Sequence, residues 1–507
     1  MKKNLFKLLP MMAACMMATA CDDGDGYEDG WWAGYGNYAD AEDGVPMPMG
    51  GDRFDEFQDN PFISVKEQPV STFSVDADGA SYAIVRRYLN GGYTGFSTGS
   101  VRIEEFLNYF TFDYAQPTGD DAVAINAEVG ACPWNSGHLL LRLGLKGREL
   151  ALDEVPLANF VFLVDVSGSM EGSDRLGLLK AGLTELLGKM RPDDRISLVT
   201  YSGKVEKVLE STPVREADKI RKAIGQLHAS GSTAGGEALK MAYEEALSCY
   251  DPTKNNRVIM GTDGDFNVGV TSTEALVEMA EGYAKRGIYF TCLGFGMGNL
   301  NDSMMEQLSN KCNGTYHYID CEDEMMKVLV HERERFVSVA NDVKCQLTFN
   351  PDVVSRYRLI GYENRVMQNE DFDDDEKDAA EIGAGQTITA LYELEPAVST
   401  ELTAPEATAD KAADEAIAFD VRYKKSLGTA SIALSQKLAP ADLSALQPLS
   451  ENMSLAAGIA AFGMVLRQSP HKGEATLDMA RELVKQSLAF DPHGYRAQLL
   501  QLIDKAK

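Results

Sequence analysis

The sequence has few basic residues and no closely spaced pair of cysteines. Its 507 residues contain 48 Lys and Arg against 77 Asp and Glu, which gives a formal net charge of −29 at pH 7. Binding to nucleic acid requires a basic face that meets the phosphates, so this charge argues against nucleic acid as a partner. No Cys-x-x-Cys motif occurs, and nothing in the sequence therefore supports a zinc or thioredoxin-type role.

The first residues are too short for a membrane span but have the features of an export signal. Three lysines precede a mostly apolar run, which ends in small residues before Cys21. The segment from Ala18 to Cys21 resembles a bacterial lipoprotein cleavage box, with Ala18 at the position where Leu is usual, and this resemblance implies lipidation of Cys21. A second box that ends at Cys15 has less apolar length before it.

An acidic run, Asp22 to Asp25, follows Cys21 and resembles the surface-export signals of Bacteroidetes lipoproteins. We therefore expect a lipid-anchored protein of the cell envelope at the outer membrane, with surface exposure and a periplasm-facing anchor both open. The membrane would be a partner through the lipid anchor alone.

Length and composition allow several domains. With 44% hydrophobic residues, the chain can build two or three cores. The segment after Cys21 is dominated by Asp, Glu, Gly, Tyr and Met, with Arg53 its single basic residue, and predicts a disordered tether. The expected divisions are a signal peptide at 1–20, the tether at 21–60, an N-terminal domain at 61–155, a central domain at 156–336 and a C-terminal domain at 337–507.

A buried strand that ends in small oxygen-bearing residues is the main functional feature. The apolar run from Phe160 to Val164 predicts a central parallel strand, and Asp165, Ser167 and Ser169 follow in the loop at its carboxyl end. One carboxylate with two hydroxyls suits a hard cation such as Mg²⁺, Mn²⁺ or Ca²⁺. Taken alone, the motif is equally compatible with a helix cap.

Two later segments extend this set. A glycine-rich loop at 231–236 precedes an amphipathic helix, and a second short strand at 258–264 ends in an acid. The candidate ligands in chain order are Asp165, Ser167, Ser169, Thr233 and Asp263. This order resembles the von Willebrand factor type A domain with its metal-ion-dependent adhesion site. The resemblance implies that the two serines and, depending on state, Thr233 contact the metal directly, while the two aspartates act largely through water.

Such a site leaves the cation incompletely neutralised. Octahedral Mg²⁺, the cation we favour, would keep one coordination position open, and a carboxylate of a partner could fill it. The sequence therefore predicts binding of a protein partner that offers an acidic residue. Asp265 follows closely and is expected to stabilise a turn.

The central segment shows the alternation of a doubly wound α/β domain with a mostly parallel sheet. Expected strands are 159–165, 195–201, 204–210, 257–262, 288–295 and 315–319, and expected helices are 174–190, 215–227, 235–249, 272–286, 301–311 and 322–335.

The flanking segments are expected to be smaller α+β domains. Before the centre we expect strands at 71–76, 122–129 and 139–145 and helices at 81–89 and 101–110. After it we expect strands at 344–349, 355–360, 387–394 and 418–423 and helices at 451–468 and 473–489. Both segments resemble those of a bacterial family of von Willebrand factor type A proteins with a conserved N-terminal segment and an uncharacterised C-terminal domain. That resemblance implies architecture rather than chemistry.

Two features that suggest other chemistry have simpler interpretations. The acidic run 371–376 lacks the Gly and Glu that an EF-hand requires, because Glu376 and Ile382 occupy those positions, and we interpret it as a solvated loop. Six cysteines follow Cys21, so disulfides are allowed, with Cys312 and Cys321 the nearest pair and Cys292 expected as a buried thiol.

Two alternative functions belong to other classes. In the first, the metal activates water or polarises a substrate. His228 is the nearby candidate base, and the serines lack a Gly-x-Ser-x-Gly elbow, so we do not expect an enzyme. In the second, the chain is a structural lipoprotein whose metal only stabilises the fold.

Overall fold

A computed structural model describes residues 51–75, 78–231, 235–264, 273–298, 300–312, 314–377, 379–397, 415–444 and 447–507. These residues belong to one compact unit, Pro46–Lys507. The expected signal peptide, Cys21 and most of the expected tether lie outside the described residues. No described helix is both long enough and apolar enough to cross a membrane.

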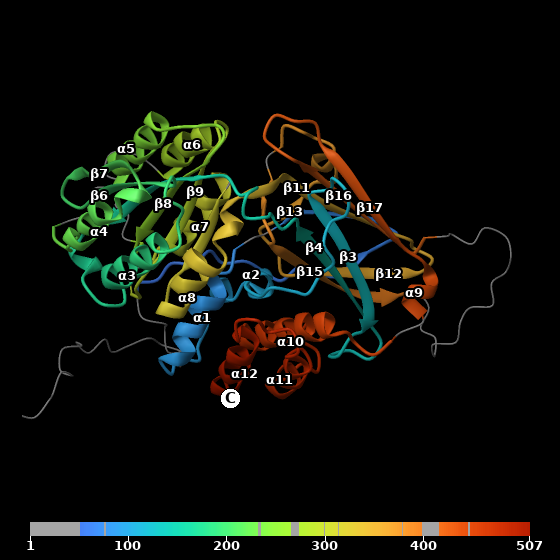
Figure 1. The fold of residues 1–507 in the computed structure, drawn as a ribbon. Helices are drawn as coiled ribbons and strands as arrows, with labels where there is room; N and C mark the ends of the chain where they lie inside the picture. Colours follow the sequence, from blue (N-terminus) through green and yellow to red (C-terminus); the bar gives the residue numbers. More distant parts are fainter. Residues whose placement is uncertain are drawn as a thin grey trace, which may run out of the picture. The chain divides into compact units, whose positions relative to one another are not determined.

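The central segment forms a six-stranded sheet in the order β10-β9-β8-β5-β6-β7 (Figure 1). Its strands are β5 (Ala158–Asp165), β6 (Arg195–Tyr201), β7 (Val205–Pro213), β8 (Asn255–Thr262), β9 (Ile288–Gly294) and β10 (Thr315–Tyr318). All neighbours are parallel except the edge pair β6–β7. The doubly wound, mostly parallel sheet expected from the sequence is confirmed.

Helices cover both faces of this sheet because its strands are apolar on both sides. Val161 and Leu163 of β5 pack in one core with α5 (Gly235–Ser248), α6 (Thr273–Ala284) and α7 (Asp302–Lys311). Phe160 and Phe162 point into the opposite core, with α3 (Leu176–Leu187), α4 (Ala217–Gln226) and α8 (Glu322–Met326). The carboxyl ends of β5, β8, β9 and β10 therefore share one edge, which we call the upper edge.

The flanking segments form two antiparallel sheets that share strands from both sides of the centre. One has the order β1-β12-β15-β4-β3, and the other β13-β2-β11-β16-β17 with β14 paired to β11. The N-terminal segment supplies β1 (Ile63–Ser64), β2 (Val70–Ser74), β3 (Val123–Ala131) and β4 (Leu139–Gly147). The C-terminal segment supplies β11 (Ser338–Phe349), β12 (Val354–Ile360), β13 (Val366–Met367), β14 (Ile382–Gly383), β15 (Thr387–Pro396), β16 (Ile417–Lys424) and β17 (Ile432–Leu438).

A sandwich core joins these two sheets, and helices cover its outer side. Leu141 of β4, Leu347 of β11 and Phe419 of β16 lie in one buried cluster between the sheets. Leu140 and Leu391 point the other way, into a core with α2 (Ile103–Asn108), α10 (Glu451–Leu466), α11 (Leu477–Lys485) and α12 (Tyr495–Lys505). The two remaining helices are α1 (Ala80–Asn90) and α9 (Pro440–Ser444). The domain boundaries at 155/156 and 336/337 stay predictions, but the flanking segments are interleaved.

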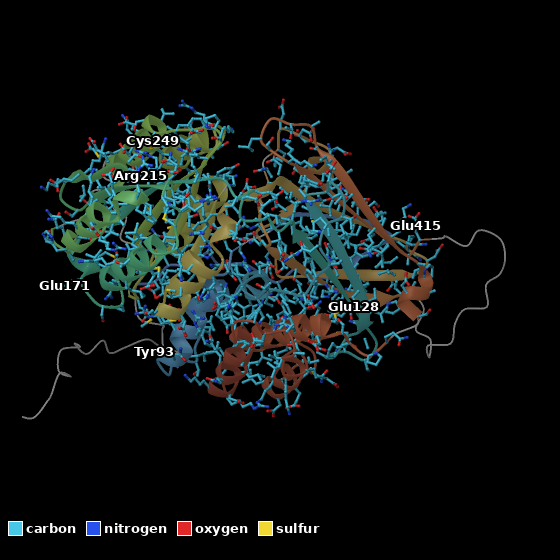
Figure 2. All side chains as sticks on the ribbon, in the orientation of Figure 1. Tyr93, Glu128, Glu171, Arg215, Cys249 and Glu415 are labelled. Atoms are coloured by element: carbon cyan, nitrogen blue, oxygen red, sulfur yellow. The ribbon has the colours of Figure 1, made fainter. Side chains whose placement is uncertain are left out.

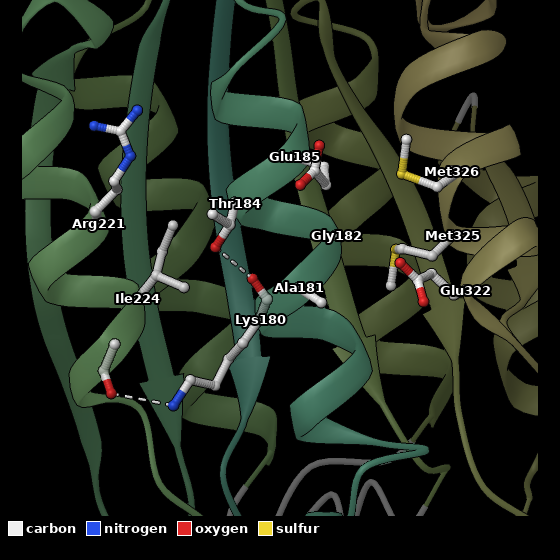
Figure 3. A pocket seen from close by; sticks show the side chains of 11 residues that line it. Lys180, Ala181, Gly182, Thr184, Glu185, Arg221, Ile224, Glu322, Met325 and Met326 are labelled. Atoms are coloured by element: carbon white, nitrogen blue, oxygen red, sulfur yellow. Dashed lines mark hydrogen bonds between the residues drawn. The ribbon is translucent and has the colours of Figure 1, made fainter.

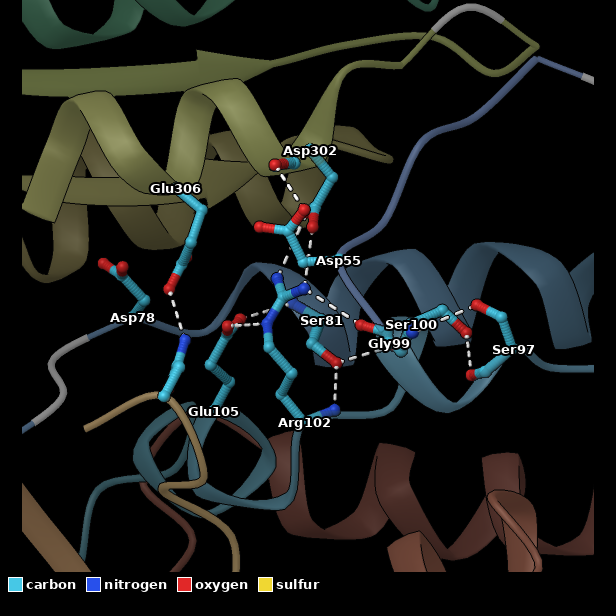
Figure 4. Close-up of polar contacts among 12 residues, drawn as sticks. Asp55, Asp78, Ser81, Ser97, Gly99, Ser100, Arg102, Glu105, Asp302 and Glu306 are labelled. Carbon is cyan, nitrogen blue, oxygen red and sulfur yellow. Dashed lines mark hydrogen bonds and ion pairs between the residues drawn. The ribbon is translucent and has the colours of Figure 1, made fainter. Parts of the chain in front are cut away.

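Helix α7 is held by charged side chains of the flanking segments. Nη1 and Nη2 of Arg102 donate to the two carboxylate oxygens of Asp302 at 2.7 and 3.1 Å, and both side chains are buried (Figure 4). One turn later, Nη2 of Arg365 lies 3.0 Å from Oε1 of Glu306. Because Asp302 starts the helix that follows the loop after β9, the flanking segments are tied to the upper edge.

Some elements differ from the sequence-based expectation. The helix expected over 322–335 consists of α8, a π-helical turn at 327–331 and a 3₁₀ turn at 333–336. Buried Lys327 donates to Glu332 at 2.8 Å across this irregular stretch, a contact five residues apart that suits a π turn. None of the six described cysteines forms a disulfide, and Cys292 is buried as expected.

The acidic loop is exposed but not free of protein contacts. Asp373 and Asp375 accept hydrogen bonds from Arg422 of β16 at 2.6 and 2.9 Å. The loop is thus solvated, as expected, and pinned to the sheet by ion pairs.

Candidate metal centre

Asp165 ends β5 and is fully buried at the upper edge. Its Oδ1 accepts a hydrogen bond from the backbone N–H of Ser167 at 2.8 Å, and its Oδ2 accepts one from Thr262 Oγ1 at 3.1 Å. The β5–β8 pairing brings Thr262 there, because Val164 pairs with Gly261, the residue before it. Two neighbouring strands therefore fix the orientation of this carboxylate.

The two serine hydroxyls converge above Asp165. Ser167 Oγ and Ser169 Oγ lie 3.0 Å apart; Ser167 is buried, whereas Ser169 is exposed. Ser167 has extended backbone just before a 3₁₀ turn at 168–170, Ser169 lies within that turn, and buried Met170 anchors the turn in the core. The site thus opens to solvent at Ser169.

A second buried carboxylate belongs to Asp263, the residue after β8. Burial raises the pKa of Asp165 to about 6, and the charge of Asp263 adds to that rise, while the hydrogen bonds to Ser167 and Thr262 oppose it. Two carboxylates close together in a buried site attract a cation.

The glycine-rich loop reaches the same edge. The backbone N–H of Gly168 donates to the carbonyl of Gly231 at 3.1 Å, and Ser230 N–H donates to the carbonyl of Val166 at 2.7 Å. Gly231 adopts a φ of +81°, which favours glycine, and its α-carbon faces the turn at Ser202. Thr233 lies outside the described residues, as does Asp265, so their positions stay predictions.

The described residues therefore bring four of the five candidate ligands to one edge. The donor set is oxygen only, with hydroxyls at the mouth and buried carboxylates beneath, and this chemistry fits a hard divalent cation. Among the described residues, no three His, Cys, Asp or Glu side chains gather in a metal-binding group.

Sequence reasoning missed Thr262. Its hydroxyl donates to Asp165 and also accepts from the backbone N–H of Gly264 at 3.2 Å. It therefore couples the two aspartate loops. The only sign in the sequence is its place directly before Asp263.

The hydrogen bond of His228, the candidate base, goes to the backbone and not to a candidate metal ligand. This histidine is exposed, and its Nδ1 lies 2.9 Å from the carbonyl oxygen of Gln226. A separate cavity of about 430 Å³ lies between α3, α4 and α8, with Ile224, Met325 and Met326 in its wall (Figure 3). None of the four candidate metal ligands that the structure describes lines it.

Three family models match successive segments of the chain, corresponding to the N-terminal, central and C-terminal segments described above. Residues 48–142 match a family model described as von Willebrand factor, residues 160–265 match the von Willebrand factor type A domain, and residues 334–507 match "Uncharacterized protein YfbK, C-terminal".

The same likeness extends over most of the chain. The uncharacterized protein YfbK of Escherichia coli is 36% identical over 470 residues, which cover 90% of this chain and 81% of that protein. Human inter-alpha-trypsin inhibitor heavy chain H3 is 29% identical over 167 residues, 31% of this chain and 18% of that protein. A solved von Willebrand factor type A protein from Catenulispora acidiphila covers 76% of this chain and 90% of its own, at 15% identity and a TM-score of 0.44.

Proposed function

This chain belongs to the YfbK family of proteins with a von Willebrand factor type A domain, and on that basis we propose that its upper edge binds a divalent cation and, through it, an acidic residue of a partner protein. Mg²⁺ is the favoured cation, with Mn²⁺ and Ca²⁺ as alternatives. The observation that carries the proposal is the convergence of the Ser167 and Ser169 hydroxyls over the buried carboxylates of Asp165 and Asp263.

The proposed ligands differ in their role according to how deeply they are buried. Ser167 and Ser169, with Thr233, would hold the cation at the mouth, and the two aspartates beneath would act largely through water. Thr262 and the Ser167 N–H keep Asp165 in place. When bound, the cation supplies an electrophilic position that a carboxylate of the partner can occupy. No step in this proposal needs a general base or a nucleophile, so the protein acts as a binding module and not as an enzyme.

We also propose that the protein works in the cell envelope, anchored through a lipid on Cys21 at the outer membrane. The support is the lysine-led apolar leader followed by a small-residue box. Labelling cells with a radioactive fatty acid tests this part: label on the wild type and none on Cys21→Ser is expected, and equal labelling of both would refute it.

The metal role is tested on the purified mature chain. Titration calorimetry with Mg²⁺ and Mn²⁺ should give a single site in the wild type and none in Asp165→Ala. The matched control is Asp193→Ala, an exposed aspartate paired with Arg215 away from the candidate ligands. Equal cation affinity in the Asp165 variant and the wild type would refute the proposal.

Partner binding is tested separately, with solubilised envelope as the source. A protein retained by the wild type in Mg²⁺, but lost with chelator and with Asp165→Ala, is the expected result. Retention of the same proteins under all three conditions would move the binding surface to the flanking segments. A purely structural metal would change the melting temperature and leave every interaction unchanged.

A further inference from the structure

Two arginines share one carboxylate on the upper edge, on the side of β9 and β10. Arg87 of α1 donates from Nη2 to Asp174 Oδ2 at 2.8 Å, and Nη1 of Arg175 lies 3.2 Å from Asp174 Oδ1. The arginine side chains keep 16% and 24% of their surface exposed, and that of Asp174 keeps 41%. We call these three residues the arginine rim.

The rim is held in place from below. Arg87 lies over the ring of Tyr318, the last residue of β10, at 5.9 Å, and the Tyr318 hydroxyl donates to the carbonyl of Gly296. Arg175 packs on Gly296 so closely that a Cβ there would lie 2.6 Å from its Nε. Gly296 has a φ of +74° and follows β9, whose neighbour β8 leads to Asp263. The rim therefore stands on the same edge as the metal ligands.

The charge of the rim is unusual for this molecule. The chain has a net charge of −29, so an acidic partner is repelled at long range, and a local positive group is needed to receive it. Within the three rim residues, two guanidinium groups and one carboxylate leave one positive charge. The carboxylate of Asp52 lies on the same side, held by hydrogen bonds from Gly298 N–H, Leu300 N–H and the Tyr88 hydroxyl, and it partly offsets that charge. Glu171, three residues before Asp174 in the sequence, is exposed (Figure 2).

Strand spacing gives the distance from Asp165 to Gly296 and Tyr318, the residues that support the rim. The sheet order is β10-β9-β8-β5, and neighbouring strands lie about 4.8 Å apart. Asp165 on β5 is therefore roughly 10 to 14 Å from the residues that follow β9 and β10. An extended peptide advances about 3.3 Å per residue, so three to four residues span this distance.

We propose that the upper edge recognises an extended acidic segment of a partner protein with two carboxylates, one for the cation and a second, about four residues away, for the arginine rim. This inference rests on the proposed function. Asp174 already contacts both arginines and therefore competes with the second carboxylate of the partner for them. The rim thus selects partners by the spacing of their acidic residues, because a charged pair with suitable geometry adds affinity only where both carboxylates reach their sites.

The test uses synthetic labelled peptides and the mature full-length chain in saturating Mg²⁺. One peptide carries a single aspartate, and the second carries Asp-Ser-Gly-Ser-Asp. Fluorescence anisotropy should show about two- to fivefold tighter binding of the second peptide. Arg87→Gln/Arg175→Gln should remove that gain and leave the single-aspartate peptide unaffected, while Arg221→Gln, on α4, keeps it. Asp174→Asn, which releases both arginines, should increase the gain.

The outcomes separate the two proposals. If the wild type gains nothing from the second aspartate, or if the double variant keeps the gain, the rim proposal fails, and loss of both peptides with chelator still supports the metal role. If the spaced peptide binds equally with chelator but not to the double variant, the metal role fails and the rim stands. Binding of neither peptide in Mg²⁺ overturns both. If the melting curve shows that the double variant does not fold, Asp174→Asn provides the test. An unchanged gain in affinity from the second aspartate in that variant would refute the rim proposal.

Discussion

At the scale of single residues, Asp165 affects both the free energy of unfolding and the proposed cation binding, and the two effects can be measured separately. Asp165 is fully buried, and its charge is opposed by Asp263. In the absence of a cation such a pair costs stability, because both carboxylates are kept from water. The cation would offset this cost.

Asp165→Asn should therefore uncouple stability from Mg²⁺. At a Mg²⁺ concentration of about 100 times the dissociation constant, ligand linkage adds about 2.7 kcal/mol to the free energy of unfolding of the wild type. The variant should gain nothing, and its metal-free melting temperature should equal or exceed that of the wild type. Urea unfolding with Mg²⁺ and with chelator measures both. A full metal-dependent gain in the variant would contradict the assignment of Asp165.

His317 on β10 should make the fold sensitive to mild acid. Burial lowers its pKa to about 3, nearby Lys327, Arg335 and Arg257 add to that shift, and Glu332 opposes it. In the unfolded chain the pKa of a histidine is about 6.5. Between pH 6.5 and pH 3 the unfolded state therefore binds a proton at His317, whereas the folded state does not. Stability from this residue is present above pH 6.5 and falls as the pH is lowered.

The slope from one such proton is at most about 1.4 kcal/mol per pH unit. Replacing His317 with Gln should reduce the loss of unfolding free energy between pH 7 and pH 5, measured by urea titration at each pH. His228→Gln, at an exposed histidine, is the matched control. Identical profiles for His317→Gln and the wild type would disprove this role.

At the scale of elements, the pairing of α2 with α7 depends on a buried ion pair. Arg102 and Asp302 side chains are 5% and 1% exposed. Removing one partner of a buried pair leaves a charge without compensation, at a cost of about 3 to 5 kcal/mol. Arg102→Met should show this loss in urea unfolding, and Arg102→Met/Asp302→Leu should recover much of it. A double variant that is no more stable than the single variant would indicate that Glu105, the second partner of Arg102, dominates.

Two helical glycines should respond differently to alanine. At Gly458 of α10, a Cβ would lie 2.8 Å from Val484 and 3.0 Å from the carbonyl of Ala480, both on α11, so Gly458→Ala should cost about 1 to 3 kcal/mol. At Gly182 of α3, the new Cβ would lie 2.2 Å from Cγ and 2.5 Å from Sδ of Met325, a side chain that also lines the cavity of about 430 Å³.

Met325 can shift into that cavity, and alanine is the better helix former, so Gly182→Ala should change stability by less than about 1 kcal/mol. Thermal unfolding of the two variants provides the comparison. A larger loss at Gly182 than at Gly458 would show that Met325 is locked in place.

Periodicity predicted the elements of the central segment closely. The start of each of its six strands and of every helix was expected within about two residues, because long amphipathic helices alternate with short apolar strands there. Strand β7 continues to Pro213, three residues past its expected end. The candidate metal ligands were placed at strand ends and in the loops that follow, and their binding of a metal stays a prediction. Thr262 was missed because its contact with Asp165 depends on pairing between two strands. Strand β17, at the sheet edge with a half-exposed alternating pattern, and helix α12 were missed.

For the whole molecule, the pairing of the flanking segments could not be predicted from local pattern. Strand β2 pairs with β11 so that Ser74 faces Lys344, and β4 pairs with β15 so that Leu139 faces Leu394. Such partners lie far apart in the sequence, and hydrophobic alternation gives a face but no partner. The segments therefore look independent in the sequence although they share sheets.

The interleaving predicts that neither flank folds alone. A chain of residues 51–336 lacks β11 and β15, the neighbours of β2 and β4, and should show no cooperative melting of its flanking part by circular dichroism or amide exchange. Supplying residues 337–507 as a second chain should restore a cooperative transition in a stoichiometric complex. Protected amides in β3 and β4 of the isolated first chain would contradict this.

Because the flanking segments share sheets, strands of the N-terminal segment are synthesised well before the strands with which they pair. Strand β4 ends at Gly147, and its neighbour β15 begins at Thr387, 240 positions later (387 − 147). A ribosome adds about 5 to 20 residues per second, so β4 waits roughly ten to fifty seconds for its neighbour. Throughout that interval an apolar strand edge is available to wrong partners. Production of this protein should therefore depend on the supply of holding chaperones, and most strongly where synthesis is slow.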